Sequence, residues 1–105
     1  MDKLARLTPA TVDVLRVLAA ADGECWGLLV VKQSGRPPGS VYPILERLET
    51  AGWVTSLWEQ DSDRSGPRRR FYNLTDDGAL AAARAIARFD ARSPVRQLRQ
   101  AGARA

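Results

Sequence analysis

The chain has 105 residues and a formal net charge of +4, from 16 basic and 12 acidic side chains. This length supports one domain with a single modest hydrophobic core. The sequence has no histidine and one cysteine, Cys25, which excludes most zinc sites, an intrachain disulfide and the usual proton-transfer group of enzymes near neutral pH. We expect no catalytic site, no metal and no cofactor, and we interpret Cys25 as a partly buried thiol.

The apolar and basic residues also limit where the protein acts. No apolar run approaches the roughly 20 residues of a membrane span, and the start, MDKLARLTPATVD, lacks the apolar core of a secretory signal. We therefore expect a cytoplasmic protein. Residues 68–105 carry nine basic and three acidic side chains, whereas residues 1–67 carry seven and nine. Most of the basic residues are arginines, whose planar guanidinium suits phosphates and base edges.

The first predicted helix follows Thr8-Pro9, an N-cap residue with proline at the first helical position. Its segment ATVDVLRVLAAA is apolar over more than half of the helix circumference. A domain of this size rarely needs so wide a stripe for its own core. Val14, Val17 and Ala21 widen the stripe, and we therefore expect the surplus to face a second subunit.

Two further helices follow, and together they predict a helix-turn-helix. The first is WGLLVVKQS, which ends at Ser34-Gly35. In the second, which ends near Ala51-Gly52, four apolar residues have the i, i+3, i+4, i+7 spacing of one core-facing stripe. These residues are Val41, Ile44, Leu45 and Leu48.

Pro43 lies near the start of this third helix, and two interpretations stay open. If the helix begins at Pro37 or Pro38, Pro43 removes a backbone hydrogen bond. If it begins near Ser40, the N–H at position 43 would be unpaired in any case. In both cases the first turn is stiffened and presents Ser40 and Tyr42 in a fixed pose.

The period then changes from helix to strand. WVTSLWEQ and RRFYNLT are rich in aromatic and β-branched residues and flank the polar turn segment DSDRSGPR, which predicts a β-hairpin. Thr75 is the expected N-cap of a last helix, DGALAAARAIARFDA. The fold class is therefore mainly α with a small β-hairpin (α+β), a winged helix-turn-helix of order α-α-α-β-β-α. We expect this domain over residues 1–90 and a frayed basic tail over 91–105.

Two motifs in this frame resemble the PadR-type bacterial transcriptional regulators. SVYPILERLETAGWV is similar to the family's Tyr-Pro-x-Leu-x-Arg-Leu-Glu recognition helix, and GPRRRFYNLTDDG to its Pro-Arg-x-x-Tyr-x-Leu-Thr-x-x-Gly wing and helix start. The resemblance covers roughly residues 8–88. It implies a homodimer that binds an operator and represses transcription. The chain departs from many members in having Trp26-Gly27 where they have Gly-Tyr, and in its short C-terminal region.

Candidate DNA contacts lie in the third helix and in the hairpin, here called the wing. The N-terminal end of a recognition helix usually enters the major groove, and arginines at a hairpin tip commonly lie along the backbone or in a minor groove. The alternatives are a solvated helix face with Arg47 paired to a glutamate of its own helix, and a solvated charge run on the wing. The candidate residues are Arg36, Gly39, Ser40, Tyr42, Pro43, Arg47, Arg64, Arg68, Arg69 and Arg70.

Dimerisation rests mainly on the resemblance, which implies contacts through the first and last helices. The candidate residues are Leu4, Leu7, Val14, Leu18, Leu80, Ala83, Ile86 and Ala87. We expect as partners a double-stranded operator with two-fold symmetry and a second copy of the chain, without a membrane or an indicated small-molecule effector. The alternative function is a winged-helix protein–protein interaction module, because the fold alone does not fix the function.

Overall fold

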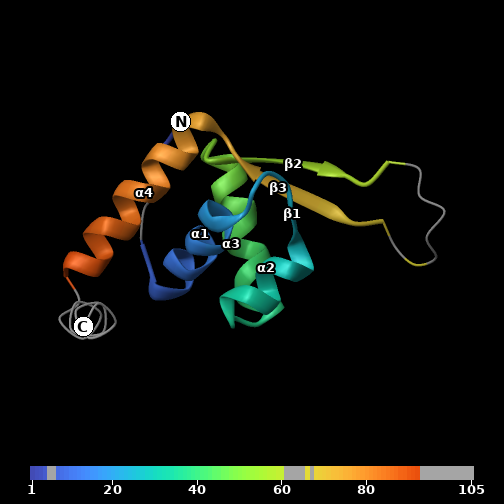
Figure 1. Ribbon diagram of the computed structural model, residues 1–105, viewed down its shortest axis with the longest axis horizontal. Helices are drawn as coiled ribbons and strands as arrows, with labels where there is room; N and C mark the ends of the chain where they lie inside the picture. The colour runs from blue at the N-terminus through green and yellow to red at the C-terminus, as the bar shows by residue number, and fades with distance from the viewer. Residues whose placement is uncertain (5–6, 61–65, 67, 93–105) are drawn as a thin grey trace.

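The computed structural model describes residues 1–4, 7–60, 66 and 68–92, so the expected fraying of the tail beyond residue 92 lies outside the described residues. Four helices and three strands follow one another along the chain (Figure 1). They are α1 (Pro9–Ala20), β1 (Cys25–Trp26), α2 (Gly27–Ser34), α3 (Pro38–Thr50), β2 (Val54–Trp58), β3 (Arg70–Leu74) and α4 (Asp76–Ala91). The expected α+β class is confirmed, with one strand more than the predicted order.

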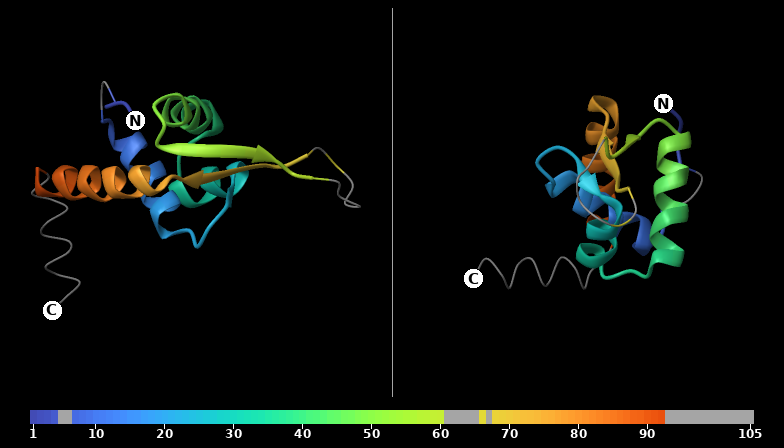
Figure 2. Two further views of the ribbon diagram at one scale, coloured as in Figure 1. Left: turned by 90° about the horizontal axis from the view of Figure 1, so that it is seen from above. Right: turned by 90° about the vertical axis from the view of Figure 1, so that its right-hand side faces the viewer.

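The additional strand, β1, completes a small antiparallel sheet of order β1-β3-β2. Cys25 pairs with Tyr72 in β3, and on the other side of β3 Val54 of β2 pairs with Leu74. The β2–β3 hairpin is the wing, and it projects from the helices in the direction opposite to α4 (Figure 2). The short β1 therefore fastens the base of the wing to the start of α2.

Helix α1 is the centre of the core and not a surface for a partner. Thr8 caps it as predicted, because its side chain accepts a hydrogen bond from the backbone N–H of Thr11 at 3.2 Å. The helix contacts α2, α3, α4 and β3 of the same chain. Val14 is 0% exposed and Leu18 is 4% exposed. The expectation that these two residues face a second subunit is therefore wrong, since the wide stripe is covered within one chain.

Helix α3 begins at Pro38 with Pro37 as its N-cap, so the first of the two interpretations of Pro43 holds. Pro43 lies inside the helix, where it cannot donate to the carbonyl of Gly39 four residues before it. The predicted stripe from Val41 to Leu48 is buried. The helix therefore has a firm apolar face and an opposite face that remains open to solvent.

Helix α4 begins as expected at the N-cap Thr75, whose side-chain oxygen accepts the N–H of Gly78 at 2.9 Å. Its buried residues are Gly78, Ala82 and Ala85. Of the four dimer candidates on this helix, Ile86 packs partly against the core, whereas Ala83 and Ala87 are exposed and Leu80 is 60% exposed. An apolar surface is thus left on the outside of the last helix.

Gly78 marks a close approach between α4 and the base of the wing. A Cβ atom at this position would lie 1.9 Å from the carbonyl oxygen of Trp53 and 2.7 Å from its carbonyl carbon. The same Trp53 oxygen accepts the backbone N–H of Thr75 at 3.0 Å. Only glycine therefore allows α4 to start where it does.

We predict that Gly78→Ala destabilises the protein, although Gly→Ala inside a helix normally stabilises by up to about 1 kcal/mol. Because the new methyl group meets backbone, we expect a loss of about 2–3 kcal/mol in the free energy of unfolding. Denaturant unfolding checks it. Gly39→Ala is the control, since a Cβ there has no heavy atom within 4 Å, and it should not destabilise. Equal stability of the Gly78→Ala variant and the original chain would contradict the close approach.

Candidate nucleic-acid interface

The solvent face of α3 carries most of the helix residues expected to contact DNA. Gly39, Tyr42, Pro43 and Arg47 are exposed, and Ser40 is half-buried. They lie opposite the buried stripe, as the helical spacing requires. Tyr42 is 41% exposed and faces the wing, whereas Pro43 and Arg47 line a different hollow beside the N-terminal residues.

The two glutamates of α3 do not pair with Arg47. Among the described residues Arg47 has no ion-pair partner, and Glu46 is exposed. Glu49 instead turns towards the wing, where it accepts hydrogen bonds from Ser56 of β2 and from Arg70 of β3, the latter at 3.4 Å. The alternative of an Arg47–glutamate pair within α3 is therefore not what the structure contains.

Arg70 is held on several sides at once. Its guanidinium donates to the hydroxyl of Ser56 at 2.7 Å, and it lies 4.8 Å from the centre of the Trp58 ring. The centre of the Tyr72 ring lies 6.0 Å from the guanidinium carbon of Arg70. Burial raises the pKa of Tyr72 above its ordinary value, while the nearby Arg70 acts in the opposite direction. Arg70 thus connects the wing to α3 and has little freedom to reach a phosphate.

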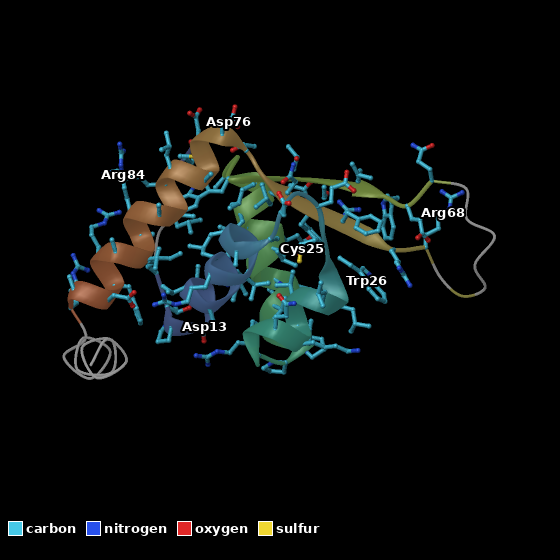
Figure 3. The ribbon with its side chains drawn as sticks, viewed as in Figure 1. Asp13, Cys25, Trp26, Arg68, Asp76 and Arg84 are labelled. Carbon is cyan, nitrogen blue, oxygen red and sulfur yellow. The ribbon has the colours of Figure 1, made fainter. Side chains whose placement is uncertain are left out.

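The other arginines of the wing differ in how freely they can move. Arg69 stacks over the ring of Trp26, 4.1 Å from its centre, a cation–π contact. Arg68 is exposed further out along the wing, beyond Trp26 (Figure 3). No described residue forms an ion pair with Arg68. Arg64 lies outside the described residues.

Arg36, also expected to contact DNA, is engaged inside the molecule. Its Nε and Nη2 atoms lie 3.0 and 2.9 Å from the Oδ2 atom of Asp13 in α1. This pair fixes the turn between α2 and α3 against the central helix. We therefore leave Arg36 out of the interface proposed below.

Cys25 is the single cysteine of the sequence, and its setting argues against a role as a nucleophile. The side chain is 2% exposed, and burial raises the pKa of its thiol above the ordinary value. A thiol of raised pKa stays protonated near neutral pH, and the thiolate is the reactive form. Cys25 is therefore a core residue beneath the wing.

Three residues of this region were not among the contacts predicted from the sequence: Trp26, Glu49 and Trp58. Trp58 is 53% exposed on β2, and an exposed tryptophan beside arginines is the one local signal that marks it. The role of Glu49 depends on Ser56 and Arg70, which follow it by 7 and 21 residues. No local spacing rule reveals a pairing of this kind.

Solved structures of similar shape include transcriptional regulators. A transcriptional regulator homologue from Pyrococcus horikoshii OT3 has a TM-score of 0.65 and 21% identity, over 80% of this chain and 79% of that one. A MarR family transcriptional regulator from Silicibacter pomeroyi DSS-3 has a TM-score of 0.64 and 23% identity, over 92% and 62%. At these identities the likeness shows the fold alone, which is that of a winged helix-turn-helix.

A third similar structure is the circadian clock associated protein Pex from Anabaena, with a TM-score of 0.64 and 22% identity, over 85% of this chain and 81% of that one. No curated protein matches the sequence of this chain. The model of the transcriptional regulator PadR-like family matches residues 16–84, well over half of the chain. The protein therefore belongs to the PadR-like family and is a DNA-binding transcription regulator, not an enzyme.

Proposed function

We propose that the protein is a dimeric repressor that inserts the N-terminal end of α3 into the major groove and lays the wing on the flanking backbone or minor groove. The supporting observation is that Tyr42 of α3 and Arg68 of the wing border the same cleft. The helix end that is proposed to read bases and Arg68, the exposed arginine among those of the wing that the structure describes, are thus on one side of the molecule. Gly39, Ser40 and Pro43 complete the reading end of α3.

The charges of this surface suggest different roles for α3 and for the wing. α3 carries Glu46, Arg47 and Glu49, so the helix as a whole does not attract phosphates. Arg68 and Arg69 supply positive charge at the wing, where phosphate contacts position a protein without reading sequence. Arg47, exposed and without an ion-pair partner among the described residues, is suited to a guanine or a phosphate. Arg64 stays a candidate from the sequence.

The outer face of α4 is the best candidate for the dimer surface. Leu80, Ala83 and Ala87 are exposed there at a spacing that places them on one side of the helix. Leu80 is 60% exposed, and together with the two alanines it forms an apolar strip along this side of α4. Leu4, Leu7 and Ile86 pack partly against the core of the same chain, and they border the surface proposed here.

A two-fold dimer would bring two copies of α3 to two half-sites about one helical turn apart. This is why we propose an operator with two-fold symmetry and repression by occupancy of the promoter. No helix in the described parts of the chain is long and apolar enough to cross a membrane. We propose that the protein acts in the cytoplasm, where the DNA of a bacterium lies.

The first test is the salt dependence of binding to DNA selected by the protein from a random pool. Because released counterions drive phosphate contacts, the log–log slope should be near −0.9 for each phosphate neutralised. We predict that Arg68→Ala reduces the slope by about 0.9 per protomer, which is about 1.8 for the dimer because both wings lose one phosphate contact. Arg70→Ala should change the slope less, since Glu49 already balances its charge, and should weaken binding by displacing the wing.

Arg84→Ala is the matched control for this measurement. Arg84 is an exposed arginine on α4, far from the wing, and points away from the helices (Figure 3). Its removal changes net charge as much as removal of Arg68 does. Because Arg84 lies one helical turn from Leu80 on the proposed dimer surface, both variants are compared at concentrations at which sedimentation shows them to be dimeric, and the slope of Arg84→Ala should then be unchanged. Equal effects of the two variants would show that the wing holds no phosphate. Failure of the original chain to select any DNA would overturn the groove-reading proposal itself.

The second test concerns the dimer. We predict that Leu80→Arg raises the dimer dissociation constant by roughly ten- to a hundredfold, because burying a leucine side chain contributes about 1.5–3 kcal/mol. Sedimentation equilibrium over a range of concentrations measures this. Leu29→Arg is the control, since Leu29 is 40% exposed on α2, away from α4. A dimer unaffected by Leu80→Arg would place the interface elsewhere.

A further inference from the structure

A cleft of about 490 Å³ separates the base of the wing from the first turns of α2 and α3. Its walls are aromatic: Trp26 at the start of α2, Tyr42 on α3, and Trp58 and Tyr72 on the wing. Trp26 lies beneath the wing in the view of Figure 3. The cleft lies between the two elements that are proposed to contact DNA, so whatever the protein binds there must also pass between them.

The walls of the cleft leave apolar surface uncovered. Trp58 is 53% exposed and Tyr42 is 41% exposed. Tryptophan and tyrosine contribute large contact areas with little loss of side-chain entropy, which makes them common at binding surfaces. The exposed rings therefore require a partner with an apolar component, which a bare phosphate or a free inorganic anion lacks.

The charge of the cleft is positive at its rim. Arg68 and Arg70 line it, and none of the described residues that line it is a carboxylate. Arg70 is tied to Glu49 and Ser56 beneath the wing, whereas Arg68 is exposed. A ligand of this cleft must therefore carry a negative group that reaches Arg68 and, next to it, apolar groups that contact the aromatic rings.

Gly27 forms the floor of the cleft and controls its depth. A Cβ atom at this position would come within 3.1 Å of the Tyr42 ring and 3.3 Å of the Tyr72 ring. Both distances are tighter than ordinary contacts, so any larger residue would push the rings into the cleft. Glycine at this position keeps the cleft open.

We propose that the cleft holds the sugar–phosphate strand that separates the major groove, read by α3, from the minor groove, reached by the wing. Deoxyribose rings pack on Trp58 and Tyr42, and one phosphate of the same strand meets Arg68. A sugar–phosphate strand has the alternation of apolar and anionic groups that the cleft requires. The inference rests on the proposed function, because it needs both elements to lie on one DNA duplex.

The test compares Trp58→Ala with its neighbour Leu57→Ala on one DNA duplex selected by the original chain. Leu57 is 47% exposed on the same strand but does not line the cleft. We expect Trp58→Ala to weaken binding about tenfold at every salt concentration with an unchanged salt slope, since sugar packing releases no counterion. Leu57→Ala should bind as the original chain does.

A second measurement locates the strand and separates a contact from a folding defect. Single phosphates of the duplex are replaced in turn by neutral methylphosphonates, and the binding of each duplex is measured. One substitution should weaken the original chain and have no further effect on Arg68→Ala, because the two changes remove the same contact. Single sugars of the duplex are also replaced in turn by a flexible propyl linker. Replacement of the sugar next to that phosphate should weaken binding of the original chain and should not weaken binding of Trp58→Ala any further.

The outcomes distinguish this inference from the proposed function. Salt-dependent binding of the original chain, together with identical affinities of the Trp58→Ala and Leu57→Ala variants, would overturn the cleft and leave the groove-reading proposal standing. The inference would also be overturned if the loss of affinity caused by Trp58→Ala added to the loss caused by every one of the DNA modifications. Trp58 would then support the fold of the wing without contacting the strand. Absence of DNA binding by the original chain would overturn both proposals.

Discussion

The elements that are proposed to face DNA are positioned around Trp53, the residue that joins α3 to the wing. Its backbone N–H donates to the carbonyl of Leu48 at 2.8 Å, and its carbonyl accepts the N–H of Thr75 at 3.0 Å. Its indole N–H donates to the carbonyl of Asp2 at 2.7 Å, and the side chain is 5% exposed. The end of α3, the start of the wing, the start of α4 and the N-terminal segment are thus fixed at one buried residue.

This junction gives the proposed dimer a direct mechanical connection to the proposed reading helix. α4 begins against the Trp53 carbonyl because Gly78 has no side chain, and further along α4 Asp90 pairs with Arg16 of the central helix α1. α4 is therefore held at both ends relative to the core that carries α3. If two copies meet through α4, the separation of their α3 helices follows from rigid packing and not from a hinge.

The sequence predicts what depends on neighbouring residues and misses what depends on distant ones. The caps Thr8 and Thr75 and the buried face of α3 are local patterns, and they are confirmed. β1 has two residues and exists only because β3 lies beside it, so no period in the sequence marks it. The apolar stripe of α1 is visible in the sequence. Whether the same chain or a second subunit covers it depends on packing between remote segments.

The same distinction applies to the candidate site. The exposed end of α3 and the arginines of the wing follow from helical spacing and composition. The positions of Arg36 and Arg70 do not, because their partners Asp13 and Glu49 precede them by 23 and 21 residues. An arginine in the sequence therefore indicates only a candidate contact. Whether it can reach DNA depends on whether a carboxylate from another element already holds it.

Glu49 shows why a helix proposed to enter DNA carries acidic residues at all. The side chains of Glu49 and Arg70 are 35% and 33% exposed, and a pair so accessible to water stabilises a fold by about 0.2–1 kcal/mol at most. A contribution this small does not explain why a negative charge lies beside the proposed position of the DNA. The contacts of Glu49 explain it, because this side chain of α3 binds both strands of the wing, through Ser56 and Arg70. The acid connects the helix to both strands of the wing. Because it also neutralises Arg70, the positive charge that is proposed to attract DNA lies further out on the wing, at Arg68.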